Sequence, residues 1–72
     1  MSIMSKELLK SIGKNIRNMR KNKKLSQEKL AEKIEMSRNA LGSIERGETN
    51  IPILTLNKIY SALGKDLSTL FK

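Results

Sequence analysis

Residues 25–47 read LSQEKLAEKIEMSRNALGSIERG, and this stretch contains two helix starts in close succession. Ser26 can cap a first helix of about residues 27–34, and Ser37 can cap a second helix of about residues 38–46. Only a three-residue turn separates the two helices. The stretch therefore predicts a helix-turn-helix at about residues 26–46.

The flanking sequence is also helical in its apolar spacing. Apolar residues recur at three- and four-residue intervals over residues 7–22 and 53–63, whereas no alternating run predicts a strand. Gly47 follows its helix at the position that takes a left-handed conformation, and the helix at residues 53–63 stops at Gly64. Asp66 can cap a short last helix that ends near the C-terminus. We therefore expect an all-α, compact five-helix domain.

Composition limits the function. The 72 residues allow one domain, so we assign residues 1–72 to a single helix-turn-helix domain. Cysteine and histidine are absent, which argues against catalysis and against a metal site, and we expect no cofactor and no enzyme activity. The sequence has no apolar run long enough to span a membrane and no secretion signal, so we expect a cytoplasmic protein.

The charge is strongly basic and unevenly distributed. The net charge is +8 and the pI is about 10.1. Residues 1–24 hold eight of the fifteen basic residues and a single acid, and helical spacing gathers most of these basic residues on one face. Such a charge is typical of nucleic-acid-binding domains, although a lysine-rich surface without a nucleic-acid partner would look the same.

The predicted helix at 38–46 has an unusual outer face. Leu41 and Ile44 share its inner side, whereas the outer side carries mostly uncharged polar groups, with arginines near both ends. Arginine and asparagine are the side chains that pair bidentately with guanine and adenine edges. Gly42 lowers helix propensity, and a close backbone approach to a partner would explain it. The alternative is an ordinary polar face with an accidental glycine.

These residues resemble a known family. The segments Ser26–Ala31, Ser37-Arg38 and Ile44–Gly47 are similar to the lambda-repressor/Cro-type (XRE-family) helix-turn-helix domain, and the similarity extends from Ile12 to Phe71. The resemblance implies a bacterial or phage transcriptional regulator, such as a repressor, that binds double-stranded operator DNA, commonly as a homodimer.

The resemblance also implies roles for individual residues. Arg38, Asn39 and Ser43 would contact bases. Gln27, Ser37, Arg46 and Asn50 would contact the DNA backbone. Arg20 and Glu45 would form a structural ion pair, which agrees with the inward position of Glu45 on its helix, where an unpaired carboxylate would be costly.

The sequence departs from the family pattern at two places. Glu35 stands where the family usually has glycine, so the preceding helix must end on a non-glycine residue at some energetic cost, or in another turn. Ile51-Pro52-Ile53 replaces the usual hydroxyl cap, which puts the start of the fourth helix in doubt by a residue or two.

We expect a homodimer, because the last two predicted helices carry more apolar surface than one short helix buries. The residues concerned are Tyr60, Leu67, Leu70 and Phe71. They could instead close the core of the monomer. We expect no small-molecule effector, because no second domain is predicted.

Two other functions remain open. The domain could be a protein-binding module, such as the antitoxin of a toxin–antitoxin pair, although the sequence ends with the fifth predicted helix and adds no partner-binding segment. Among regulators, Asn50-Ile51 is similar to the controller proteins of restriction–modification systems, so this subtype stands beside phage-type repressors.

Overall fold

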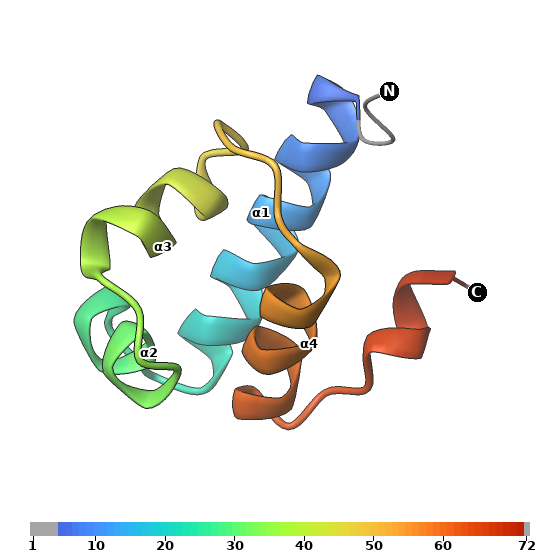
Figure 1. Ribbon diagram of the computed structural model, residues 1–72. Helices are drawn as coiled ribbons and strands as arrows, with labels where there is room; N and C mark the ends of the chain where they lie inside the picture. The colour runs from blue at the N-terminus through green and yellow to red at the C-terminus, as the bar shows by residue number, and fades with distance from the viewer. Residues whose placement is uncertain (1–4, 72) are drawn as a thin grey trace.

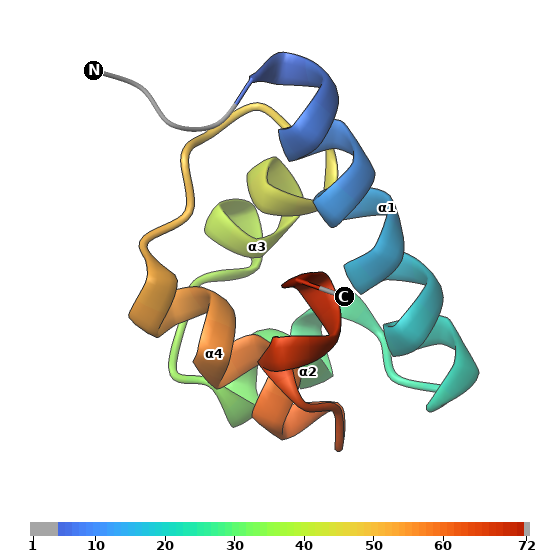
Figure 2. The ribbon, with the colours of Figure 1, turned by 90° about the vertical axis from the view of Figure 1, so that its right-hand side faces the viewer.

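The structure, a computed structural model, describes the backbone of residues 5–71 and the side chains of residues 5–69. Over this range it contains four α-helices and one 3-10 helix: α1 (Lys6–Asn22), α2 (Gln27–Lys33), α3 (Arg38–Glu45), α4 (Ile53–Ala62) and η1 (Leu67–Phe71). Figures 1 and 2 show α3 packed against α1 and α2, with η1 beside α4. The predicted α-helix boundaries agree with the structure to within one residue.

Serine caps start three of the four α-helices. The hydroxyl oxygens of Ser5, Ser26 and Ser37 accept hydrogen bonds from the backbone N–H three residues further on, at 3.0–3.1 Å. The two caps expected within the helix-turn-helix are therefore confirmed. α4 has Pro52 at its N-cap without a side-chain hydrogen bond, yet still begins at Ile53.

Each of the four α-helices is followed, two positions after its last residue, by a residue with left-handed backbone. These residues are Lys24 (φ 59°), Glu35 (φ 56°), Gly47 (φ 72°) and Gly64 (φ 71°). At α2, the Glu35 N–H donates to the carbonyl of Glu32 and the Met36 N–H donates to the carbonyl of Ala31, which is the Schellman pattern. The expectation that Glu35 ends α2 in place of glycine is confirmed.

The core lies between the helices and is almost entirely aliphatic. Its fully buried large side chains are Ile16, Leu30, Leu41, Leu56, Ile59 and Leu63. At Gly13, α1 comes so close to α3 that a Cβ atom would lie 2.5 Å from the carbonyl oxygens of Ile44 and Glu45. This contact fixes the C-terminal end of α3 against α1.

The expectation of a fifth α-helix is wrong, because the segment Leu67–Phe71 is a 3-10 helix. The Asp66 carboxylate accepts a hydrogen bond from the Ser68 N–H at 3.0 Å, and its backbone carbonyl accepts from the N–H of Thr69 at 3.1 Å. The Thr69 hydroxyl donates to the same carbonyl at 2.9 Å. These local bonds favour the tighter turn over an α-helix in so short a segment.

Candidate nucleic-acid interface

The first turn of α3 projects into solvent. Arg38 and Asn39 are exposed and Ser43, one turn later, is half-buried. Leu41 and Ile44, by contrast, are 0 % and 4 % exposed and hold the inner side of the helix in the core. The helix therefore presents three side chains that can donate or accept hydrogen bonds at the edge of a base.

Gly42 makes room on this face for Arg46. A Cβ atom at Gly42 would lie 3.1 Å from Nη1 of Arg46 and 3.8 Å from Oε1 of Gln27. The Arg46 guanidinium therefore lies across α3, and its Nη2 donates a hydrogen bond to the Ser43 hydroxyl oxygen at 3.4 Å. In the free protein, the space that a side chain at Gly42 would occupy is therefore taken by Arg46.

Arg20 and Glu45 form a buried, bidentate ion pair between α1 and α3. Nε of Arg20 donates to Oε2 of Glu45 at 2.8 Å, and Nη2 donates to Oε1 at 3.1 Å. Nη1 donates to the backbone carbonyl of Leu25 at 2.7 Å. The side chains are only 9 % and 2 % exposed, so the pair ties the end of α3 to α1 inside the protein.

Glu45 also fixes the orientation of Gln27, the first residue of α2. Nε2 of Gln27 donates to Oε1 of Glu45 at 3.0 Å. A carboxylate only accepts hydrogen bonds, so it selects the amide nitrogen and turns the Gln27 carbonyl oxygen away from itself. Gln27 thus keeps one free N–H and a carbonyl oxygen for a ligand.

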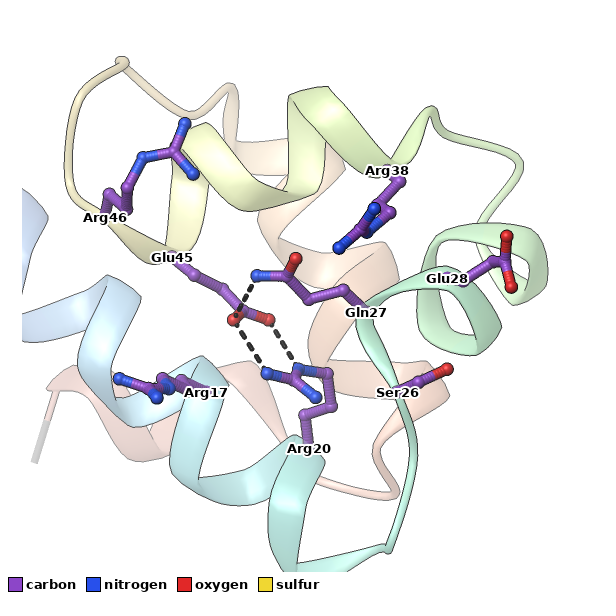
Figure 3. A pocket seen from close by; sticks show the side chains of 8 residues that line it. All are labelled: Arg17, Arg20, Ser26, Gln27, Glu28, Arg38, Glu45 and Arg46. Atoms are coloured by element: carbon purple, nitrogen blue, oxygen red, sulfur yellow. Dashed lines mark hydrogen bonds and ion pairs between the residues drawn. The ribbon is translucent and has the colours of Figure 1, made fainter.

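A hollow of about 620 Å³ opens beside this network (Figure 3). Side chains from α1, α2 and α3 and from the residues at their ends line it: Arg17, Arg20, Ser26, Gln27, Glu28, Arg38, Glu45 and Arg46. Three of the side chains expected to contact DNA line it, those of Gln27, Arg38 and Arg46, and the Arg38 side chain points toward that of Gln27 (Figure 3). The hollow is wide and polar, as an opening for part of a nucleic-acid backbone would be.

The loop after α3 carries the remaining expected backbone contacts. Nε of Arg46 pairs with Oε2 of Glu48 at 3.0 Å, and both side chains are more than half exposed. Asn50 is exposed and lines a second hollow of about 800 Å³, together with Arg46 and with Lys6 and Lys10 of α1. Ser37 is exposed, and its hydroxyl oxygen caps α3 while its O–H remains able to donate.

The residues expected at a dimer interface have different surroundings. Tyr60 is 2 % exposed and lies in the core, and this burial raises the pKa of its hydroxyl. Leu67 is partly buried against the same core. The side chains of Leu70 and Phe71 lie outside the described residues. Tyr60 thus serves the monomer core in this structure.

Sequence reasoning missed three exposed residues. Arg17 lies at the hollow, and its position beside Arg20 on the helical wheel was the available signal. Ile53 and Leu54, at the start of α4, are 53 % and 79 % exposed. Their apolar side chains make this turn of α4 a further candidate for contact with another protein surface.

None of the helices in the described part of the chain has the length and apolarity needed to cross a bilayer. Within residues 5–71, no group of three or more acidic, histidine or cysteine side chains is arranged to hold a metal ion.

Comparison with known sequences links this geometry to helix-turn-helix proteins. The helix-turn-helix family HTH_3 matches residues 16–70. A control protein, C.MunI, from a Mycoplasma species is 42 % identical over 60 residues, which cover 82 % of this chain and 81 % of that protein. The immunity repressor protein of Bacillus phage phi105 is 40 % identical over 60 residues, which cover 83 % of this chain; the chain spans only 42 % of the repressor's length.

Solved structures agree with the sequence relatives. The clp gene regulator ClgR from Corynebacterium glutamicum superimposes with a TM-score of 0.81 at 26 % identity, covering 85 % of this chain and 78 % of that one. A hypothetical transcription factor, NHTF, from Neisseria gives a TM-score of 0.81 at 29 % identity and covers all of this chain and 84 % of its own.

Proposed function

The chain belongs to the HTH_3 (XRE-type) helix-turn-helix family of DNA-binding transcriptional regulators, and we propose that it binds a specific operator with α3 in the major groove. The observation that carries this proposal is the outer face of α3. Its first turn is exposed and begins with Arg38 and Asn39, and the helix that holds it has a capped start and a buried inner side. In helix-turn-helix docking, the N-terminal residues of the second helix reach the base edges.

Other residues would hold the DNA without reading it. Gln27, Ser37, Arg46 and Asn50 surround α3 and expose N–H, O–H or guanidinium donors, which suit phosphate oxygens. Gln27 would use its second amide N–H, since Glu45 occupies the first. Arg46 would exchange its exposed partner Glu48 for a phosphate. The ionic part of binding would therefore be sequence-independent.

One copy of α3 covers too little DNA for a long operator. Its eight residues span about 12 Å, which corresponds to only a few base pairs. A homodimer would place a second α3 about 34 Å away, one helical turn along the duplex. The proposed interface comprises the C-terminal segment with Leu67, Leu70 and Phe71, whereas Tyr60 would support it from within the core.

Among regulators, the controller-protein subtype stands beside the phage-type repressors. The chain is 42 % identical to the control protein and 40 % identical to the phage repressor, each over 60 residues. With operator DNA as its ligand, the protein would act in the cytoplasm of a bacterial cell, with its bound fraction at the nucleoid.

Selection of bound sites from random duplex DNA, at two salt concentrations, tests the proposal. We expect enrichment of a two-fold symmetric sequence with half-sites one helical turn apart, together with sedimentation of a dimer at micromolar concentration or on the operator. A protein that enriches no sequence would be a protein-binding module, such as an antitoxin. A monomer both with and without operator would contradict the dimer.

A further inference from the structure

Arg17 lies outside the helix-turn-helix, on the exposed face of α1, yet its side chain borders the hollow between α1, α2 and α3 (Figure 3). We infer that this hollow takes one phosphate of the DNA backbone and that Arg17 binds it, which extends the DNA contact onto α1. The inference rests on the proposed DNA-binding function.

The hollow has an excess of positive charge that the protein does not neutralise. Four of its lining residues are arginines and two are glutamates. Arg20 and Glu45 neutralise each other within their bidentate pair, and Glu45 is further occupied by Gln27. Arg17 and Arg38 take part in no ion pair among the described residues, so Glu28 alone opposes two free guanidinium groups within the hollow.

The available hydrogen-bond groups at the hollow are mainly donors. Glu45 has its acceptor oxygens filled by Arg20 and Gln27, whereas the guanidinium of Arg17 and the second amide N–H of Gln27 remain free. A planar guanidinium and an amide N–H match the oxygens of a phosphodiester. The same phosphate could therefore be gripped from α1 by Arg17 and from α2 by Gln27.

Position separates Arg17 from the other basic residues of its helix. At 100° per residue, Arg17 lies 60° round the helix from buried Arg20, whereas Lys21 and Lys14 are turned a further 40° and 60° from the hollow. Neither lysine lines the hollow. Lys14 thus carries the same charge on the same helix without facing the site, which makes it a matched control.

The test compares Arg17→Ala with Lys14→Ala in salt-dependent DNA titrations. Binding is measured by fluorescence anisotropy on the selected operator duplex and on a random-sequence duplex of equal length, between about 50 and 200 mM salt. Loss of one phosphate contact should reduce the slope of log K against log salt by about 0.9. The deficit of Arg17→Ala relative to wild type should therefore be about 3.5 times larger at the lower salt.

We expect this loss on both duplexes, because a phosphate contact carries no sequence information. Lys14→Ala should keep the wild-type slope, and Arg17→Lys should restore most of it. Duplexes with a single neutral methylphosphonate supply a second readout. At one position, the substitution should weaken binding by wild type more than binding by Arg17→Ala.

Equal slopes for Arg17→Ala and Lys14→Ala would overturn the inference, as would a methylphosphonate scan without such a position. A change in base preference with Arg17→Ala would overturn it too, since Arg17 would then touch a base. If wild type binds both duplexes equally while the Arg17 effect persists, the proposed sequence-specific function fails and the phosphate site stands. Circular dichroism checks that each variant is folded, which we expect for exposed positions.

Discussion

Removing either partner of the Arg20–Glu45 pair should strongly destabilise the domain. Glu45 is 2 % exposed in its side chain and accepts three hydrogen bonds, two from Arg20 and one from Gln27. In Glu45→Ala, the Arg20 guanidinium would stay buried with only the Leu25 carbonyl as partner. Breaking a buried pair in this way costs about 3–5 kcal/mol.

This cost is large beside the total stability of so small a chain. A domain of 72 residues is stable by about 4–11 kcal/mol at the usual stability per residue. For this size, each kcal/mol shifts the Tm by about 4–8 °C, so the single variants should lose at least about 12 °C. Thermal unfolding followed by circular dichroism measures the shift for Glu45→Ala and Arg20→Ala.

Two further variants isolate the cause. Arg17→Ala removes an exposed arginine from the same helix and should change stability by less than about 0.5 kcal/mol. The double variant Arg20→Met/Glu45→Met removes both charges together and should be much more stable than the two single losses added. If the single alanine variants melt at the temperature of Arg17→Ala, the buried pair does not stabilise the fold and the reasoning is refuted.

Three other predictions concern base reading, a helix end and pH. Arg38→Ala or Asn39→Ala should lower the binding free energy on the best operator by about 1–3 kcal/mol and relax the preference at particular base pairs. Alanine at Gln27, Arg46 or Asn50 should instead weaken binding to all sites alike. If Arg38→Ala and Asn39→Ala also weaken all sites alike in competition titrations, α3 does not read bases. Glu35→Gly should raise the Tm by about 2–8 °C, because left-handed backbone strains any residue with a Cβ atom. The 3.9 Å ion pair that Glu35 makes with Lys58 is exposed and adds little stability. An equal gain in Tm with Glu35→Ala would contradict this cause. Hydrogen bonds from the Ser68 backbone, and then from its side chain, hold the pKa of Asp66 below its ordinary value of 3.8. Asp66 therefore stabilises the start of η1 above that pH and loses this effect as the pH falls through its folded-state pKa. NMR titration of Asp66 should show the lowered pKa, and the Asp66→Asn variant should lack this pH dependence of stability.

The α-helices were predictable because their ends depend on local chemistry. Ser26 and Ser37 cap the starts of α2 and α3, and Gly47 and Gly64 follow the ends of α3 and α4. Each of these signals depends only on residues a few positions apart in the sequence. Lys24 takes the same left-handed conformation as these glycines, and nothing in a run of lysines signals it. The last helix was predicted wrongly because side-chain bonds around Asp66 compete with the α-helical pattern.

The site was only partly predictable because its key contacts join residues far apart in the chain. The exposed face of α3 follows from helical spacing alone. The bond between Gln27 and Glu45 joins residues 18 positions apart and depends on the angle at which α2 meets α3. Arg17 lines the hollow only because α1 lies beside that junction. Tyr60 has an apolar position on its helix that suits a core or a dimer interface equally, and only the packing of the helices shows that it is buried in the core.

Two glycines allow the basic helix α1 to lie close to α3. A Cβ atom at Gly13 would lie 2.5 Å from the Ile44 and Glu45 carbonyl oxygens, and one at Gly47 would lie 2.7 Å from the Cα atom of Lys10. The backbones of α1 and the end of α3 therefore touch at two points, and larger residues would force them apart. This contact buries the C-terminal part of α3, whereas its first turn stays exposed. The same close approach brings α1 beside the exposed face of α3, and under the proposed function this places Arg17 next to a phosphate that α3 does not cover.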